Sequence, residues 1–65
     1  MAKDQKAKFR YHRDHAGLWR WRLRAPNSLI IAESGQGYHR LEDCLAGATL
    51  VQLYAPSAPI EPEGN

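Results

Sequence analysis

Cysteine is almost absent from this chain, and the absence limits how the fold can be held together. Its 65 residues contain a single cysteine, Cys44, so an internal disulfide is excluded. Cysteine and histidine together are also too few and too scattered to predict a four-ligand zinc site. Because a chain this short buries a limited core, we expect oligomerisation, and specifically a homodimer, to supplement its stability.

Long apolar runs are absent as well. No stretch reaches the length of a membrane span or of the apolar part of a secretory signal, so we expect no membrane partner. Together with the single unpaired cysteine, this favours the reducing cytoplasm. Prolines are concentrated near the C-terminus, where Pro56, Pro59 and Pro62 recur at intervals of three.

Acidic residues are scarce in the first half of the chain. Up to Ser34 there are eight Lys or Arg against three acids, whereas from Gly35 onward there is one Arg against four acids. A local cationic excess attracts polyanions, but it also keeps a sheet soluble and discourages edge-to-edge pairing.

The clearest pattern in the sequence is a strict alternation of apolar and charged residues. Residues 18–24 read Leu, Trp, Arg, Trp, Arg, Leu, Arg, which is the period of a strand with one apolar and one charged face. Phe9 and Tyr11 alternate with Arg10 and His12 in a preceding strand, and the turn at residues 14–17 closes a hairpin between the two. A second turn at residues 25–28, in which Asn27 is expected to adopt the left-handed region, leads to a third strand at residues 29–34. Being apolar on both faces, this third strand is predicted to be the most covered of the three.

From about Arg40 to Tyr54 the apolar period changes to that of a helix. The stripe is predicted to pack on the tryptophan face of the sheet, and Pro56 to end the helix. The fold class predicted is therefore α+β, an antiparallel three-stranded meander followed by one helix. The predicted core consists of Phe9, Tyr11, Trp19, Trp21, Leu23, Ile30 or Ile31, Leu41, Leu45, Ala48 and Val51.

The order of these signals resembles the YegP-like family of small bacterial domains. The resemblance covers roughly residues 9–56 and rests on Arg20-Trp21-Arg22-Leu23, on Ile30-Ile31-Ala32 with Ser34, on Gly37-Tyr38 and on the helix that follows. It implies a β-β-β-α-β unit, paired as a homodimer with a continuous sheet and exchanged C-terminal strands, and a family without an established activity. Residues 1–7 would then form a flexible basic arm, residues 8–56 the single domain, and residues 57–65 a proline-rich tail with a short exchanged strand.

The chain departs from the family pattern at four places. Arg40 and Leu41 replace a serine and lysine, so the hydroxyl cap of the helix is missing. Asn27-Ser28 replaces Asn-Gly, and Ala48 stands where the pattern has isoleucine. Pro59 and Pro62 lack an N–H and would shorten the final strand to residues 57–61.

Two functions remain open at this point. The first is a non-enzymatic homodimeric module; its predicted subunit contact consists of Leu50, Leu53, Tyr54 and Ile60. The second is nucleic-acid binding, since guanidinium groups grip phosphates. The residues predicted for it are Arg10, His12, Arg20, Arg22 and Arg24.

Enzymatic chemistry is not predicted. The acids are scattered, and no Ser/His/Asp or paired-carboxylate arrangement stands out. Cys44 lies on the apolar stripe, where burial raises the pKa of a thiol and makes it inert. His12, His15 and His39 have no metal-ligand spacing, and Gly35 and Gly37 lack the further residues of a phosphate loop. We therefore expect no catalytic residue, no cofactor and no small-molecule substrate.

Overall fold

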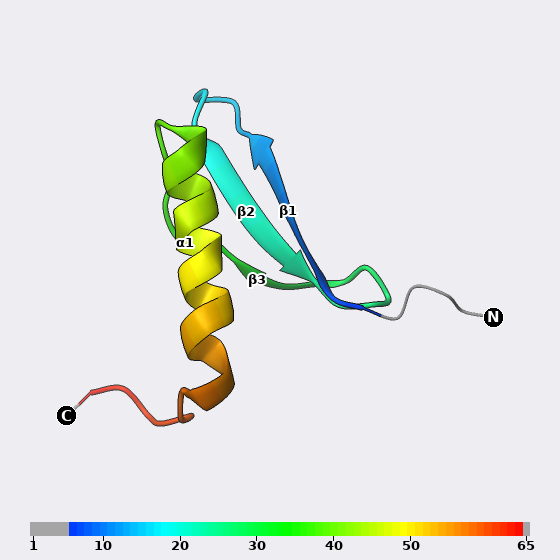
Figure 1. The fold of residues 1–65 in the computed structure, drawn as a ribbon, viewed down its shortest axis with the longest axis vertical. Coiled ribbons are helices and arrows are strands. Elements are labelled where there is room, and N and C mark those ends of the chain that lie inside the picture. Colours follow the sequence, from blue (N-terminus) through cyan, green and yellow to red (C-terminus); the bar gives the residue numbers. More distant parts are fainter. Residues whose placement is uncertain (1–5, 65) are drawn as a thin grey trace.

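A computed structural model describes residues 6–64, so most of the predicted basic arm lies outside the described residues. The chain forms a three-stranded antiparallel sheet, β1 (Lys8–Arg13), β2 (Trp19–Arg24) and β3 (Ile30–Glu33), followed by the helix α1 (Leu41–Tyr54). The strands lie in the order β1-β2-β3, so β2 is central (Figure 1). The predicted meander and helix are confirmed.

The register of the sheet places the tryptophans where the alternation predicted. Tyr11 pairs with Trp21 and Phe9 with Leu23, so these side chains share one face. The helix packs on that face and contacts β2. Trp21 is buried there, and its ring lies edge-on to Phe9 at a centroid distance of 5.4 Å.

Close approach of the helix to the sheet depends on Gly47. A Cβ at this position would lie 2.5 Å from the Tyr38 hydroxyl oxygen and 3.5 Å from Trp21 Nε1. The missing side chain thus lets α1 settle onto the central strand. Cys44, on the same side of the helix, is fully buried.

Both turns close as strand connections. Asp14 N–H donates to Leu18 O, and Gly17 adopts a φ of 83°. In the second turn Ser28 N–H donates to Ala25 O, and it is Ser28, with a φ of 74°, that takes the left-handed conformation. The prediction for Asn27 was therefore wrong by one residue.

The third strand is the least covered, contrary to prediction. β3 is an edge strand of four residues, and Ile31 in it is 59% exposed. A bulge between Leu23 and Arg24 accompanies its pairing with β2. A continuous apolar run predicts burial, but β3 lies at the edge of the sheet, and none of the described elements covers Ile31.

Past β3 the chain rejoins the sheet. Ser34 N–H donates to Trp21 O, and Tyr38 exchanges two backbone hydrogen bonds with Trp19, at 2.7 and 2.9 Å. This bridge ties the segment that leads into α1 to the beginning of β2. The N-terminal end of the helix is thereby fixed beside the hairpin (Figure 1).

Of the predicted core members, only Trp21 is buried in the part of the chain that the structure describes, and Ile30, Ile31, Tyr11 and Leu45 are exposed. Tyr11 is 51% and Leu45 is 39% exposed. The helix lies over the central strand and leaves β1 uncovered at Tyr11, and Leu45 lies at the border of the helical stripe. Cys44 and Ala48 thus belong to the packed side, while Leu45 does not reach it.

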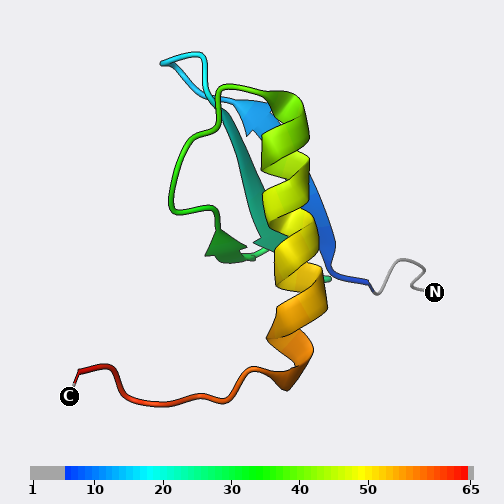
Figure 2. The ribbon, with the colours of Figure 1, turned by 60° about the vertical axis from the view of Figure 1, so that its left-hand side comes forward.

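The C-terminal half of α1 extends beyond the sheet (Figures 1 and 2). It ends in a short 3₁₀ turn, η1 (Ala55–Ser57), after which residues 58–64 run away from the sheet without forming a strand. In the described single chain the predicted final strand is therefore not formed.

Candidate functional site

The face of the sheet opposite the helix carries a dense set of cations. We call this surface, composed of the outward side chains of β1 and β2, the basic face; it consists of Lys8, Arg10, His12, Arg20, Arg22 and Arg24. Its residues stand directly opposite one another as Lys8–Arg24, Arg10–Arg22 and His12–Arg20. Every cross-strand pair on this face of the hairpin therefore joins two basic side chains. Like charges in this arrangement destabilise a sheet.

Two arginines of the basic face differ in their contacts with acidic side chains. Arg20 Nε donates a 2.6 Å hydrogen bond to Asp14. Arg22 stands opposite Glu33 in the register, yet no salt bridge joins them, and Arg22 Nε is buried without a hydrogen-bond partner among residues 6–64. Glu33 therefore does not neutralise Arg22 across the two strands. Such pairing would have been one structural explanation of the alternating arginines.

The Asp14 carboxylate organises the hairpin turn. Its Oδ1 accepts hydrogen bonds from the backbone N–H groups of Ala16 and Leu18, both at 2.9 Å, while Oδ2 accepts from Arg20. The Arg20 side chain foremost, and then the Leu18 N–H, lower the pKa of Asp14 from 3.8 to about 2. Arg20 is therefore held in place, and its charge is already matched.

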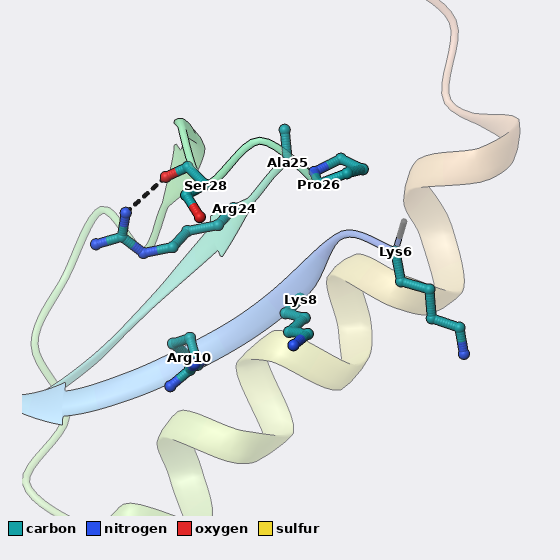
Figure 3. A pocket seen from close by; sticks show the side chains of 7 residues that line it. All are labelled: Lys6, Lys8, Arg10, Arg24, Ala25, Pro26 and Ser28. Atoms are coloured by element: carbon teal, nitrogen blue, oxygen red, sulfur yellow. Dashed lines mark hydrogen bonds between the residues drawn. The ribbon is translucent and has the colours of Figure 1, made fainter. Parts of the chain in front are cut away.

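Residues of the basic face take part in lining two shallow hollows. The first is lined by three residues at and before β1 and four at the β2–β3 turn: Lys6, Lys8, Arg10, Arg24, Ala25, Pro26 and Ser28 (Figure 3). The second lies at the hairpin end and is lined by His12, Arg13, Asp14, His15 and Arg22. Lys6 and the turn residues of the first hollow were not predicted as site residues, because only the register brings them beside Arg24.

Apolar side chains remain exposed on the overhanging part of α1. Leu50, Leu53 and Tyr54, which we call the overhang, are all more than half exposed, and Ile60 in the tail is fully exposed. Leu29 and Ile31, beside and within β3, are also exposed, although their apolar run predicted a covered strand. The predicted subunit contact is thus apolar and accessible in the single chain.

Arg13 marks a site that the sequence analysis did not single out. Its guanidinium carbon lies 5.1 Å from the centre of the Trp19 ring, and Tyr11 contacts the same ring edge-on. These side chains lie on the helix side of the hairpin, so Arg13 is the one arginine of the hairpin outside the basic face. Only the strand register reveals the difference.

Side chains that could ligate a metal are not brought together in the part of the chain that the structure describes. Among the described residues no group of three His, Cys, Asp or Glu side chains is placed to hold a metal ion. Burial raises the pKa of the Cys44 thiol, as predicted. Within residues 6–64 there is also no helix with the length and apolar character needed to cross a membrane.

Comparison with known proteins matches this fold and sequence. A family model described as a domain of unknown function, DUF1508, matches residues 14–61. A UPF0339 protein from Methanosarcina acetivorans is 46% identical over 54 residues, covering 83% of this chain and 91% of its relative. A UPF0339 protein from Neisseria meningitidis serogroup B is 34% identical over 53 residues, covering 82% and 93%.

A solved structure has the same fold. The NMR solution structure of a protein from Haloferax volcanii superimposes with a TM-score of 0.84 at 36% sequence identity. The match covers 91% of this chain and 98% of that protein. Relatives thus occur in archaea as well as bacteria, which widens the bacterial range that the resemblance implied.

Proposed function

This chain belongs to the DUF1508 family, the YegP-like group that its sequence resembles, and from that premise we propose that it acts as a non-enzymatic homodimeric module. The observation that carries the proposal is the overhang. Leu50, Leu53 and Tyr54 are more than half exposed and belong to the C-terminal half of α1. That half of the helix extends beyond the sheet (Figures 1 and 2). Exposed apolar side chains gathered in this way are typical of an interaction surface.

A second copy of the chain fits this surface better than an unrelated partner. The edge of β3 away from β2 has no strand beside it among the described residues, and Ile31 next to it is exposed. A two-fold partner could extend the sheet at this edge while its tail, with Ile60, packs against the overhang. The last strand would then form by exchange between subunits.

Light scattering at micromolar concentration tests the dimer. We expect a particle of twice the 7.4 kDa chain mass, and a 7.4 kDa particle would contradict the proposal. Leu53→Asp should dissociate the dimer because it places a charge in the apolar contact. Gln52→Asp, exposed on the same helix, is the matched control and should leave the mass unchanged.

Strand exchange has a separate test. Ile60→Asp should weaken the dimer if the tail packs against the partner, and Glu61→Gln beside it should not. If Ile60→Asp leaves the dissociation constant unchanged, the exchanged strand is excluded while the dimer itself stands.

The basic face favours a second function, nucleic-acid binding. Arg10 stands directly opposite Arg22, and Lys8 opposite Arg24, so basic side chains gather on one face of the hairpin, and such a surface attracts polyanions. Labelled single-stranded and duplex oligonucleotides, titrated at two salt concentrations, test it: affinity should fall steeply with salt. Substituting Arg20, Arg22 and Arg24 by Gln should abolish binding while the domain stays folded, and equal binding by this variant would contradict the function.

A further inference from the structure

We propose that the second hollow, at the end of the hairpin, binds the phosphate group of a small phosphorylated molecule. Residues of β1, of β2 and of the turn between them line this hollow: His12, Arg13, Asp14, His15 and Arg22. The inference does not depend on the homodimer or on nucleic-acid binding, because it concerns a ligand held by one chain. It differs from the expectation, drawn from the sequence, that the chain has no small-molecule substrate.

Arg22 provides the first argument, because part of its guanidinium is buried without a hydrogen bond. Arg22 Nε has no hydrogen-bond partner among residues 6–64, and Glu33 opposite it makes no salt bridge with it. On the other side Arg22 faces a second cation, Arg10. A charged group that is partly removed from water without a partner costs free energy. Because the charge is delocalised over three nitrogens, an anion that contacts the terminal Nη groups from the hollow would offset this cost.

Two imidazoles of the same hollow provide the second argument. His12 belongs to the end of β1 and His15 to the turn, so the possible donors come from three segments of the chain when Arg22 of β2 is included. An imidazole N–H can donate a hydrogen bond to an anion. A phosphate group presents oxygens in tetrahedral directions and can accept from donors on several sides, whereas the two oxygens of a carboxylate lie in one plane. We therefore expect phosphate to bind better than a carboxylate.

The other charged residues that line the hollow are engaged elsewhere. Asp14 Oδ2 accepts a 2.6 Å hydrogen bond from Arg20, and its Oδ1 accepts from two backbone N–H groups. Its negative charge is thus balanced by a cation that does not itself line the hollow. The Arg13 guanidinium lies 5.1 Å from the centre of the Trp19 ring, on the helix side of the hairpin. We therefore assign the contact with the anion to Arg22 and not to Arg13.

The size of the hollow suits a small molecule better than a bare ion. Its volume is about 330 Å³, within the range of roughly 300–1,000 Å³ that small-molecule sites occupy. A phosphate group fills only part of this space, so the remainder is left for the organic part of the ligand. Although two histidines and one aspartate line the hollow, they are not among residues placed to hold a metal ion in the described chain.

Two matched pairs of variants test the site. Arg22→Gln removes the unpaired cation, and Arg24→Gln removes an equal charge from the same face of β2 outside the hollow. His15→Gln and His39→Gln each remove an exposed histidine, of which only His15 lines the hollow. The chain is titrated with inorganic phosphate, with phenyl phosphate and with acetate at constant ionic strength, and binding is followed by amide NMR.

Both phosphate probes should shift the amide signals of residues 12–16 and 22 in the wild-type chain. We expect Arg22→Gln to weaken phenyl phosphate binding by about tenfold, which corresponds to the loss of one hydrogen bond to a charged group, and Arg24→Gln to change it by less than about twofold. Equal losses in the two arginine variants would overturn the site. Shifts spread over all basic residues would show an adventitious ion only, and acetate binding as tight as phosphate would overturn the ligand class.

The histidine pair keeps the test valid if Arg22→Gln lowers the melting temperature. Both histidines are exposed, so neither variant should unfold the domain, and only His15→Gln should weaken phenyl phosphate binding. Equal binding by His15→Gln and His39→Gln would contradict the contact with His15. A final titration uses one oligonucleotide with and without a 5′-phosphate. If the 5′-phosphorylated oligonucleotide binds in the hollow and phenyl phosphate does not, the site belongs to a nucleic-acid end and the small-molecule proposal is overturned.

Discussion

Asp14 and Arg20 form a salt bridge on the basic face, with 2.6 Å between Arg20 Nε and Asp14 Oδ2. Three hydrogen-bond donors converge on the carboxylate, and it belongs to the turn that joins β1 and β2. The pair thus joins a charged side chain of β2 to the carboxylate that holds the hairpin turn in shape.

Asp14 predicts a specific pH dependence of stability. Its pKa is lowered to about 2 in the folded chain, so the ionised form stabilises the fold above the unfolded pKa near 3.8. That contribution is lost as the pH falls from about 4 toward 2. Urea unfolding at several pH values should show the decline, and Asp14→Asn should remove this part of it. An unchanged acid limb in the variant would contradict the role of Asp14.

Gly47 should not tolerate a methyl group. Gly47→Ala would gain about 1 kcal/mol from helix propensity, but its Cβ would lie 2.5 Å from the Tyr38 hydroxyl, so we expect a net loss of about 1–3 kcal/mol. Thermal unfolding measures the difference. Adding Tyr38→Phe should recover part of the loss, because the hydroxyl that is contacted is removed. Stabilisation by Gly47→Ala alone would refute this close packing.

Ser28 carries backbone strain that glycine would remove. Its φ of 74° is unfavourable for a residue with a Cβ, so Ser28→Gly should raise the free energy of unfolding by about 1 kcal/mol. The urea midpoint should increase accordingly. Asn27→Gly next to it serves as the control and should bring no gain, since the structure does not give Asn27 a positive φ.

The helix N-terminus can also be improved. Arg40 occupies the N-cap position with extended backbone angles and makes no side-chain cap hydrogen bond. Arg40→Ser should raise the free energy of unfolding by about 1 kcal/mol, because the serine hydroxyl can accept a hydrogen bond from a backbone N–H of the first helical turn. Arg40→Ala separates this effect from the loss of charge, and it should give no comparable increase in the melting temperature.

The alternation at residues 18–24 predicted the faces of β2 correctly, and the helical stripe predicted which side α1 covers. These features succeed because each depends on a local period. The apolar run Leu29, Ile30 and Ile31 led to a wrong prediction, because such a run is compatible with a central strand as well as with an exposed edge strand. The missing cap at Arg40 was foreseen because it depends on one position only.

The candidate site could also be predicted only in part from the sequence. Arg20, Arg22 and Arg24 follow from alternation, but the pairing of Arg20 with Asp14 depends on the turn that places the carboxylate. Lys6 joins the first hollow through the path of the chain before β1, which no sequence period specifies. Strand register, a long-range property, also decides that Lys8 faces Arg24.

The two backbone hydrogen bonds between Trp19 and Tyr38 anchor the N-terminal end of α1 to the sheet. We expect fluctuations of the helix to increase with distance from this bridge and to be largest near Tyr54, because the C-terminal half of α1 extends beyond the sheet (Figures 1 and 2). In an isolated chain, amide hydrogen exchange should therefore be slowest near Cys44 and accelerate turn by turn toward the C-terminal end. A second subunit bound to the C-terminal end of α1 would slow amide exchange there, so that exchange rates would differ less along the helix.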